Sequence, residues 1–205
     1  MKIAIRADGN TKIGMGHLMR CISIAIALKE RQADVCFLTN DIRSKEFIEE
    51  KGFVCHLLTE FSTLYENESP EVIQFVKNNG IHLVIVDSYF VSVDDLEKIN
   101  AVVPVFYLDD LGKMDLPVSG LLNYNIYGKS MSYEKQYAQS VKLLLGSLYA
   151  PVKVQFKNTP YELKQEAIAI GDFENQIPYR ETHFYDYDRY LRQITIQKYG
   201  RGASN

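Results

Sequence analysis

Residues 3–29 decide the fold, and they read IAIRADGNTKIGMGHLMRCISIAIALK. The apolar run Ile3-Ala4-Ile5 predicts a first buried strand, and apolar residues recur at helical spacing over residues 18–29. A glycine-containing turn separates the two. This order places free backbone N–H groups and the positive end of a helix at one point. That point suits a phosphate, a carboxylate or developing negative charge.

His17 lies at the end of this turn, at or near the first turn of the expected helix. Histidine is the side chain whose ordinary titration range suits proton transfer near neutral pH. The spacing Gly-x-Gly-His lacks the third glycine of a dinucleotide fingerprint and the Gly-Lys-Ser/Thr of a P-loop. Two interpretations stay open, a general base or a helix N-terminal residue that packs on the strand.

Apolar runs and helical patterns alternate from residue 3 to residue 108. Further strands are expected at residues 34–38, 53–57, 83–86 and 102–108. Helices are expected at residues 44–51, from Ser69 as N-cap with Pro70 at N1, and from residue 93. This alternation predicts an α/β fold, a Rossmann-like parallel sheet with helices on both faces.

Polar residues follow three of these expected strands. Residues 6–8 follow the first strand, residues 87–89 the fourth and residues 109–110 the fifth. Ligands of parallel sheets bind beyond the carboxyl ends of the strands, so these residues are expected to converge beside the glycine turn. Ordinary polar loops are the alternative at any one of the three places.

The composition describes a globular chain of 205 residues with 46% hydrophobic residues and a net charge of −3. This charge argues against nucleic acid as a partner, and no apolar run is long enough to cross a membrane. The start of the chain has no signal-peptide pattern. Cys21, Cys36 and Cys55 form no C-x-x-C pair, so reduced thiols in a cytoplasmic protein are expected. Neither a metal site nor a cofactor is predicted.

The chain changes character near residue 156. We predict a Rossmann-like domain over residues 1–156 and a divergent or incomplete segment over residues 157–205. Tyrosines and arginines interleave in residues 179–201, a pattern that can stack on single-stranded bases. Acidic residues are mixed among them, which favours a poorly folded tail.

Four sequence blocks together resemble one enzyme family. The first is Arg-Ala-Asp-Gly-Asn at residues 6–10, followed by Ile-Gly-Met-Gly-His at 13–17 and Arg-Cys at 20–21. Val-Asp-Ser-Tyr (86–89), Leu-Asp-Asp (108–110) and Leu-Asn-Tyr-Asn (122–125) follow in order, with a weaker match at 144–150. They resemble the hydrolases that release UDP from UDP-2,4-diacetamido-2,4,6-trideoxy-β-L-altropyranose in pseudaminic acid biosynthesis, which have relatives among spore coat polysaccharide biosynthesis proteins. The resemblance covers roughly the first 150 residues.

This resemblance implies the N-terminal domain of a GT-B type fold, in which two Rossmann-like halves enclose the active site. The second half of such enzymes opens with a strand that runs into a Gly-Gly-x-Asp turn. Residues 167–172, Ala-Ile-Ala-Ile-Gly-Asp, contain a single glycine at the corresponding place. The second domain is therefore expected to be truncated or replaced.

The resemblance also implies hydrolysis of the anomeric bond to UDP, with His17 as the base that activates water. Asp8 is expected to orient His17 or a substrate hydroxyl, and Arg6 to pair with a carboxylate such as Asp109 or to meet the ligand. Tyr89 and Asn125 are candidates to bind acetamido and hydroxyl groups. For each of these four residues a structural role is the alternative, and the sequence alone favours it. Arg20 and Cys21 are equally well explained by packing. The full set of predicted substrate-binding residues is Arg6, Asp8, Asn10, Gly14, Gly16, Tyr89, Asp109 and Asn125.

Three functions remain open from the sequence. The first is an active UDP-sugar hydrolase in nonulosonic acid or surface polysaccharide biosynthesis. The second is a non-catalytic sugar-binding remnant, or half of a split enzyme whose cleft is completed by a second chain or by self-association. The third is a GT-B type glycosyltransferase. The His17 signature favours the hydrolase over the transferase, and the unrecognised second half favours the remnant.

Overall fold

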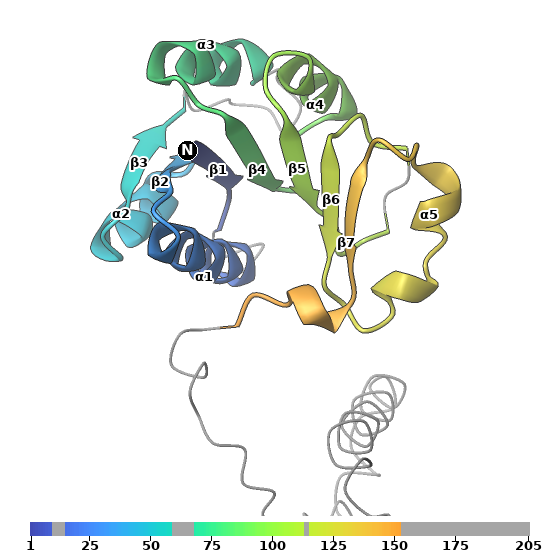
Figure 1. Ribbon diagram of the computed structural model, residues 1–205. Coiled ribbons are helices and arrows are strands. Elements are labelled where there is room, and N and C mark those ends of the chain that lie inside the picture. Colours follow the sequence, from blue (N-terminus) through green and yellow to red (C-terminus); the bar gives the residue numbers. More distant parts are fainter. Residues whose placement is uncertain (10–14, 59–67, 113–114, 153–205) are drawn as a thin grey trace, which may run out of the picture. The chain divides into compact units, whose positions relative to one another are not determined.

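The computed structural model describes residues 1–9, 15–58, 68–112 and 115–152. Seven parallel strands form one sheet in the order β3-β2-β1-β4-β5-β6-β7 (Figure 1). The strands are β1 Lys2–Ala7, β2 Asp34–Thr39, β3 Val54–Leu57, β4 Leu83–Asp87, β5 Val105–Leu108, β6 Gly120–Asn123 and β7 Lys142–Leu145. The predicted Rossmann-like parallel sheet is confirmed. The segment predicted over residues 157–205 lies outside the described residues.

Helices cover both faces of this sheet. Helices α1 (Gly16–Glu30) and α2 (Ile42–Glu50) lie on one face, and α3 (Ser69–Asn79) and α4 (Val93–Asn100) lie on the other (Figure 1). The short helix α5 (Tyr133–Gln136) follows β6. Two single turns of 3-10 helix complete the described elements, Gly128–Ser130 and Ser147–Tyr149.

Several element boundaries differ from the prediction by one to three residues, and the starts of α3 and β5 show the cause. Ser69 is the first residue of α3 and not its N-cap. The N–H of Ser69 donates to Asp95 Oδ1 of α4 at 3.0 Å, so a tertiary hydrogen bond satisfies an N–H group at the start of this helix. Strand β5 begins at Val105 and not at residue 102. In the turn after α4, the N–H groups of Val102 and Val103 both donate to the carbonyl of Ile99, so the strand begins only after this turn.

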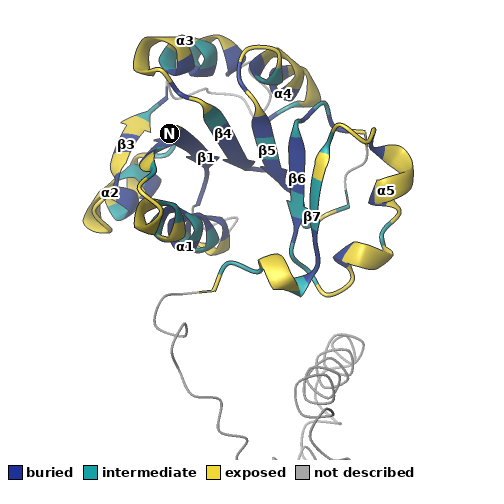
Figure 2. Cartoon of the chain, in the orientation of Figure 1, coloured by how far each residue is buried: buried dark blue, intermediate teal, exposed yellow. Residues whose placement is uncertain are grey.

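Alternation along the strands divides the core into two layers. Ile3 and Ile5 of β1 pack against α1 and α2, with Leu18 of α1 in the same cluster. Ala4 points the other way, into the cluster that contains Val72 of α3. Successive side chains of a strand point to opposite faces, so the parity of a position predicts which helices it meets. Figure 2 shows the buried strands between helices that are exposed on their outer sides.

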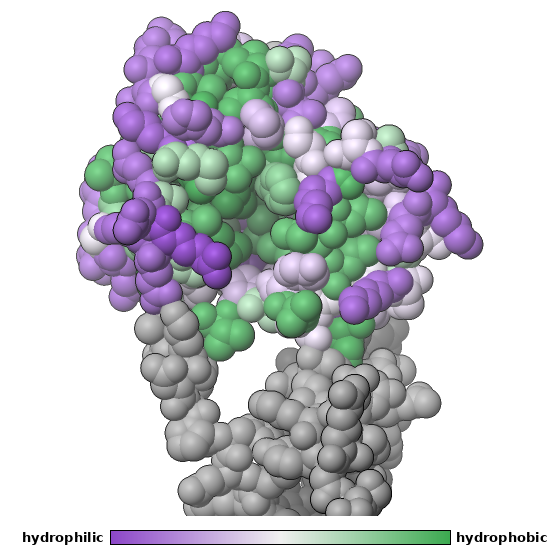
Figure 3. All heavy atoms as spheres, in the orientation of Figure 1, coloured by the Kyte–Doolittle hydropathy of each residue, from purple (hydrophilic) through white to green (hydrophobic). Residues whose placement is uncertain are grey.

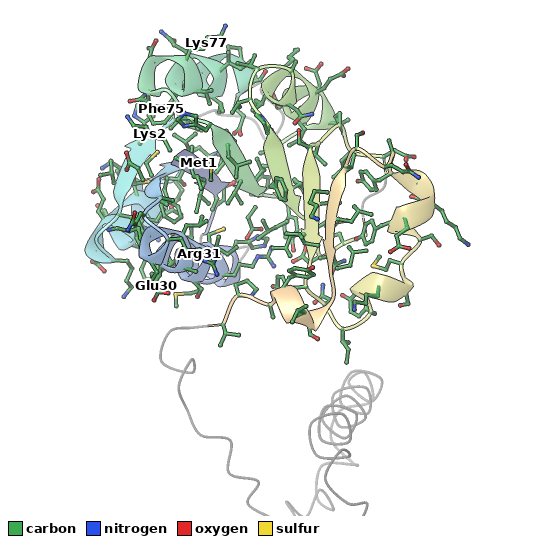
Figure 4. The ribbon with its side chains drawn as sticks, in the orientation of Figure 1. Met1, Lys2, Glu30, Arg31, Phe75 and Lys77 are labelled. Carbon is green, nitrogen blue, oxygen red and sulfur yellow. The ribbon has the colours of Figure 1, made fainter. Side chains whose placement is uncertain are left out.

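The strand order of the sheet reverses between β1 and β4. Strands β2 and β3 extend the sheet on one side of β1, and β4 begins the other side. The start of β1 lies near the end of α1, because Asp34, four residues after the last residue of α1, pairs with Lys2 and donates its N–H to the Met1 carbonyl at 2.9 Å. Figure 4 labels Met1 and Lys2 of β1 and Glu30 and Arg31 at the end of α1. Helix α1 therefore runs back along the sheet, and its first residues lie at the carboxyl edge. Ligand crevices of open parallel sheets form at this edge, where the strand order reverses.

The surface has the polarity of an ordinary globular domain on the face seen in Figure 3. Hydrophilic residues cover the outer helices, and apolar residues lie toward the middle of that face. None of the helices in the described ranges has the length and apolar character that a membrane span requires.

Candidate functional site

The start of α1 presents backbone N–H groups at the carboxyl edge of the sheet. Its N-cap residue Met15 makes no side-chain capping bond, and its first turn contains no acidic residue. Gly16 is exposed, and a Cβ at this position would meet nothing within 4 Å. The predicted substrate-binding residues Asn10 and Gly14 lie outside the described residues.

Six side chains gather around the first two turns of α1. Asp87 shares the parity of Ile85 and so faces α1, where His17, Arg20 and Cys21 lie. The polar residues after β5 and β6 that reach Arg20 follow the same rule, because Leu108 and Leu122 also face α1. We call this set the His17 cluster: His17, Arg20, Asp87, Tyr89, Asp110 and Tyr124.

His17 and Asp87 form the buried centre of the cluster. Nδ1 of His17 lies 2.6 Å from Oδ1 of Asp87. The side chain of Asp87 is 1% exposed and that of His17 is 8% exposed, so water barely reaches the pair. Pairing with a buried carboxylate is the arrangement that orients catalytic histidines in hydrolases.

Arg20 joins this pair to two further strand ends. Its Nε and Nη2 donate to the two oxygens of Asp87, and its Nη1 donates to Asp110 Oδ2 and to Tyr124 OH, each at 2.9 Å. Burial works to raise the pKa of Asp87, but the hydrogen bonds from Arg20 and His17 and the charge of Arg20 outweigh it and lower that pKa below its ordinary value. Asp87 is therefore an anion at neutral pH.

Tyr89 covers the solvent side of the cluster. Its ring meets the ring of His17 edge to face, with centroids 4.5 Å apart. Its hydroxyl donates to the carboxylate of Asp110 at 3.0 Å. Burial and this hydrogen bond raise the pKa of Tyr89 to about 12, so the phenol stays protonated. At 37% exposed, Tyr89 is the member of the cluster most open to a ligand among those whose exposure is described.

Arg6 and Asp8 belong to a second group on the opposite face of the sheet. Arg6 donates to Glu68 through Nε and Nη2, each at 2.9 Å, and it also pairs with Asp8. Ser88 Oγ donates to Asp8 Oδ2 at 2.6 Å. We call these four residues the Arg6 cluster: Arg6, Asp8, Glu68 and Ser88. All four are buried.

This arrangement corrects two expected pairings. The carboxylate on His17 is Asp87 and not Asp8, and the partners of Arg6 are Glu68 and Asp8 and not Asp109. Parity explains the first difference, because Asp8 shares the parity of Ala4, which faces α3 and α4, whereas His17 lies in α1 on the other face. Asp109 follows β5, which β4 separates from β1, and its carboxylate accepts from Tyr133 and from the N–H groups of residues 111 and 112.

Asp109 and Asn125 lie in a third group near α5. Asp109 Oδ2 accepts from Tyr133 OH at 2.7 Å, and its Oδ1 accepts from the N–H groups of residues 111 and 112. Asn123 Nδ2 donates to Tyr133 OH, and Asn125 donates through N and Nδ2 to Asn123 Oδ1 at 3.0 Å. Asp109 is buried, whereas Asn125 is half-buried and nearer to solvent.

The predicted residues are therefore brought together only in part. His17, Gly16 and Tyr89 share one place, and Arg6, Asp8, Asp109 and Asn125 lie in the other two groups. The prediction gave no individual role to four members of the His17 cluster, Arg20, Asp87, Asp110 and Tyr124, although it expected residues 87–89 and 109–110 at this edge of the sheet. Helical spacing of three residues pairs Arg20 with His17, and strand parity selects Asp87, so the signal was present in the sequence.

The described residues hold no other evident reactive centre. They contain no group of three or more His, Cys, Asp or Glu residues that could hold a metal ion. Burial, together with the charge of Asp87 and a hydrogen bond to it, raises the pKa of Cys21 well above its ordinary value, so this thiol stays protonated. Every fully buried side-chain nitrogen and oxygen in this part of the chain has a hydrogen-bond partner.

No protein family model matches the chain. In a comparison of folds, its structure is similar to the crystal structure of Acinetobacter baumannii MurG, with a TM-score of 0.45 and 9% identity, over 70% of this chain and 44% of that chain. An uncharacterized protein of Methanocaldococcus jannaschii is 24% identical over 172 residues, which is 82% of this chain and 34% of that protein.

A second curated relative agrees with the resemblance drawn from the sequence. It comes from Campylobacter jejuni and is 29% identical over 171 residues, which is 81% of this chain. The chain spans 57% and 34% of the lengths of these two relatives. The predicted resemblance is confirmed: the chain is similar over most of its length to a UDP-2,4-diacetamido-2,4,6-trideoxy-β-L-altropyranose hydrolase.

Proposed function

We propose that this chain carries the catalytic, sugar-side half of an enzyme that hydrolyses a UDP-linked diacetamido-trideoxy sugar to the free sugar and UDP. The observation that carries the proposal is the His17–Asp87 contact at the start of α1. Similarity to the Campylobacter jejuni hydrolase supports this choice of reaction. Such a sugar would serve pseudaminic acid or another surface polysaccharide pathway.

The proposed step uses His17 Nε2 as a general base. Nε2 takes a proton from water while the water oxygen bonds to the anomeric carbon. The bond between that carbon and the diphosphate oxygen breaks, and its electron pair leaves with UDP. The imidazolium then returns its proton to solvent. The positive end of α1 would stabilise the negative charge of the departing diphosphate.

The remaining predicted residues take more limited roles in this proposal. Tyr89 and Asn125 are the exposed and half-buried groups that would bind acetamido and hydroxyl groups of the sugar. Gly16 would allow close approach of the ligand to the start of α1, together with Asn10 and Gly14. Arg6, Asp8 and Asp109 would hold the edge of the sheet in shape, because their charges are already paired or hydrogen-bonded.

The test is the release of UDP from the UDP-linked diacetamido sugar by the purified chain and by its His17→Gln variant. We expect the substitution to lower kcat by about 10²–10⁴-fold. KM should change less, because a base acts mainly in the transition state. His82→Gln is the matched control, since His82 lies at the opposite edge of the sheet beside Lys2 and is expected to leave kcat near the wild-type value.

Two results would count against the proposal. Absence of UDP release by the wild-type chain, both alone and with a second polypeptide, contradicts the hydrolase, and near-normal turnover by His17→Gln removes this residue from the mechanism. A sugar-binding protein without catalysis is the second candidate, because the exposed Tyr89 can bind a sugar whether or not the buried His17 acts on it. Saturable sugar binding with no turnover would establish it, and turnover restored by a second polypeptide would identify a split enzyme.

A further inference from the structure

The Asp87 carboxylate is fully engaged by α1. Its Oδ1 faces His17 Nδ1 and Arg20 Nη2, and its Oδ2 accepts from Arg20 Nε and from the Cys21 thiol, the last at 3.3 Å. The carboxylate is 1% exposed on its side chain. Because donors engage both oxygens of this buried carboxylate, it has a single orientation.

The position of the proton on His17 follows from these contacts. An ionised carboxylate only accepts hydrogen bonds, so the 2.6 Å contact with Asp87 requires a proton on Nδ1. Arg20 Nη2 also lies 2.9 Å from Nδ1, and because a guanidinium only donates, this contact taken alone would favour a lone pair on Nδ1. The same Nη2 already donates to Asp87 Oδ1, and the shorter contact of Nδ1 with the anionic oxygen decides for the proton on Nδ1. In the opposite tautomer, the lone pair of Nδ1 would face the anionic oxygen at 2.6 Å, which is repulsive.

Arg20 is itself held from two further strand ends. Asp110, after β5, and Tyr124, after β6, both accept from Nη1 at 2.9 Å. The guanidinium carbon lies 5.7 Å from the centre of the Tyr124 ring. Residues at the ends of β5 and β6 therefore fix the guanidinium that orients Asp87.

We infer that Asp87 and Arg20 are positioning residues that hold His17 in the Nδ1–H tautomer, so that Nε2 is left free to accept a proton. Neither is a catalytic residue, because both act through His17. The inference rests on the proposed function insofar as it explains catalysis, but the tautomer is a property of the chain without substrate. Asp87 would also stabilise the imidazolium that forms when Nε2 takes its proton.

The test is ¹⁵N NMR of the full chain labelled at histidine, at a pH where the imidazole is neutral. The chain has four histidines, and the His17→Gln variant assigns the relevant signals. We expect wild-type His17 to be protonated at Nδ1. We expect Asp87→Asn to shift the population toward Nε2–H, because its single amide oxygen must serve both Arg20 and His17. Wild-type His17 in the Nε2–H form overturns the inference without any variant.

Asp95→Asn is the matched control. Asp95 is also a buried carboxylate, but it accepts from Ser69 N and Ser92 Oγ at the starts of α3 and α4. Its substitution should lower stability and leave the His17 tautomer unchanged. An unchanged tautomer in Asp87→Asn contradicts the role of Asp87. Arg20→Lys tests the pair if Asp87→Asn folds poorly, because an ammonium cannot serve both Asp87 oxygens, and a retained Nδ1–H population would contradict the role of Arg20.

Kinetics separate this inference from the proposed function. Asp87→Asn should lower kcat for UDP release at least about 100-fold, with a smaller change in KM. A tautomer that changes in a chain without hydrolase activity refutes the proposed function and keeps the positioning pair. If activity depends on His17 but neither the tautomer nor kcat changes in Asp87→Asn, the proposed function is supported and the positioning role of Asp87 is refuted.

Discussion

The His17 cluster stabilises the charged form of the Asp87 carboxylate. Hydrogen bonds from Arg20 and His17 outweigh its burial and lower its pKa below the ordinary value of 3.8. The unfolded chain therefore binds this proton more readily than the folded chain. By linkage, the stabilisation from Asp87 is complete at neutral pH and is lost as the pH falls through the lowered pKa.

We predict that the difference in unfolding free energy between the wild type and Asp87→Asn shrinks as the pH falls from about 7 to about 3. The loss should begin only as the pH approaches the ordinary pKa of 3.8. Urea denaturation across this range measures it. Ser23→Ala in α1 is the control, because it removes no ionisable group and its difference from the wild type should stay constant. A difference that grows on acidification would contradict the lowered pKa.

Glu68 has a comparable role in the Arg6 cluster. Removing one partner of a buried ion pair leaves the other charge uncompensated, so we predict that Glu68→Gln lowers the free energy of unfolding by about 3 kcal/mol. Glu49→Gln, in the exposed pair with Lys45, should cost about 0.5 kcal/mol or less. Denaturant titration of both variants measures the contrast. Equal losses would show that Asp8 alone neutralises Arg6.

At the scale of residues, the sequence predicted the place of His17 better than its partners. The glycine spacing and the following helix placed His17 at the carboxyl edge, and its contact with the residue that ends β4 agrees with that. Asp8 does not pair with His17, because its position along the chain places it on the face of α3 and α4, where it pairs with Arg6. Glu68 carries no local pattern that links it to Arg6, which lies 62 residues away.

Among the elements, the connection from β7 to the following 3-10 turn depends on one glycine. Gly146 has φ +91° and ψ 172°, a backbone conformation that is essentially restricted to glycine. Its N–H donates to the carbonyl of Asn123 at 2.8 Å, which ties the end of β7 to the end of β6. A Cβ here would also approach the Lys129 side chain, whose Cε would lie 3.1 Å away.

We predict that Gly146→Ala lowers the free energy of unfolding by about 1–3 kcal/mol, because alanine is strained in this conformation. Gly16→Ala is the control, since its Cβ would meet nothing within 4 Å and its backbone is helical. Thermal unfolding followed by circular dichroism compares the two variants. Similar melting temperatures would mean that the β7 connection relaxes without cost.

The elements were predicted well where helices and strands alternate. Strands β1 to β5 and their helices follow the regular pattern, whereas β6 and β7 were not recognised as strands. Each has only four residues, and β6 begins with a glycine. The described residues between β5 and β6 contain no helix, and α5 before β7 has four residues. The regular alternation of strands and long helices therefore does not predict these two strands.

For the molecule as a whole, charge pairing bears on how UDP would bind. The guanidinium groups of Arg6 and Arg20 are both held by carboxylates of their own clusters. A diphosphate at the carboxyl edge would therefore meet backbone N–H groups of α1, with these two cations already engaged. Backbone dipoles at a helix start contribute modestly when exposed to solvent.

We predict that this chain alone binds UDP with a Kd on the order of millimolar, about 4 kcal/mol of binding free energy. Calorimetric titration measures this Kd, with uridine as the matched control. If the diphosphate adds little binding free energy, the Kd of UDP and the Kd of uridine should be similar. A micromolar Kd for UDP with millimolar uridine would mean that residues outside the described ranges supply a diphosphate site.

The order of the strands also determines when the site can exist. His17 and Asp87 are 70 residues apart, and they meet only because β4 pairs directly with β1. A nascent chain that has made α1 but not β4 has the histidine without its carboxylate. Contacts over such separations close late, because the loop between them must be ordered first. Protonation of His17 Nδ1 would therefore report, on heating or during refolding, whether β1 and β4 are paired.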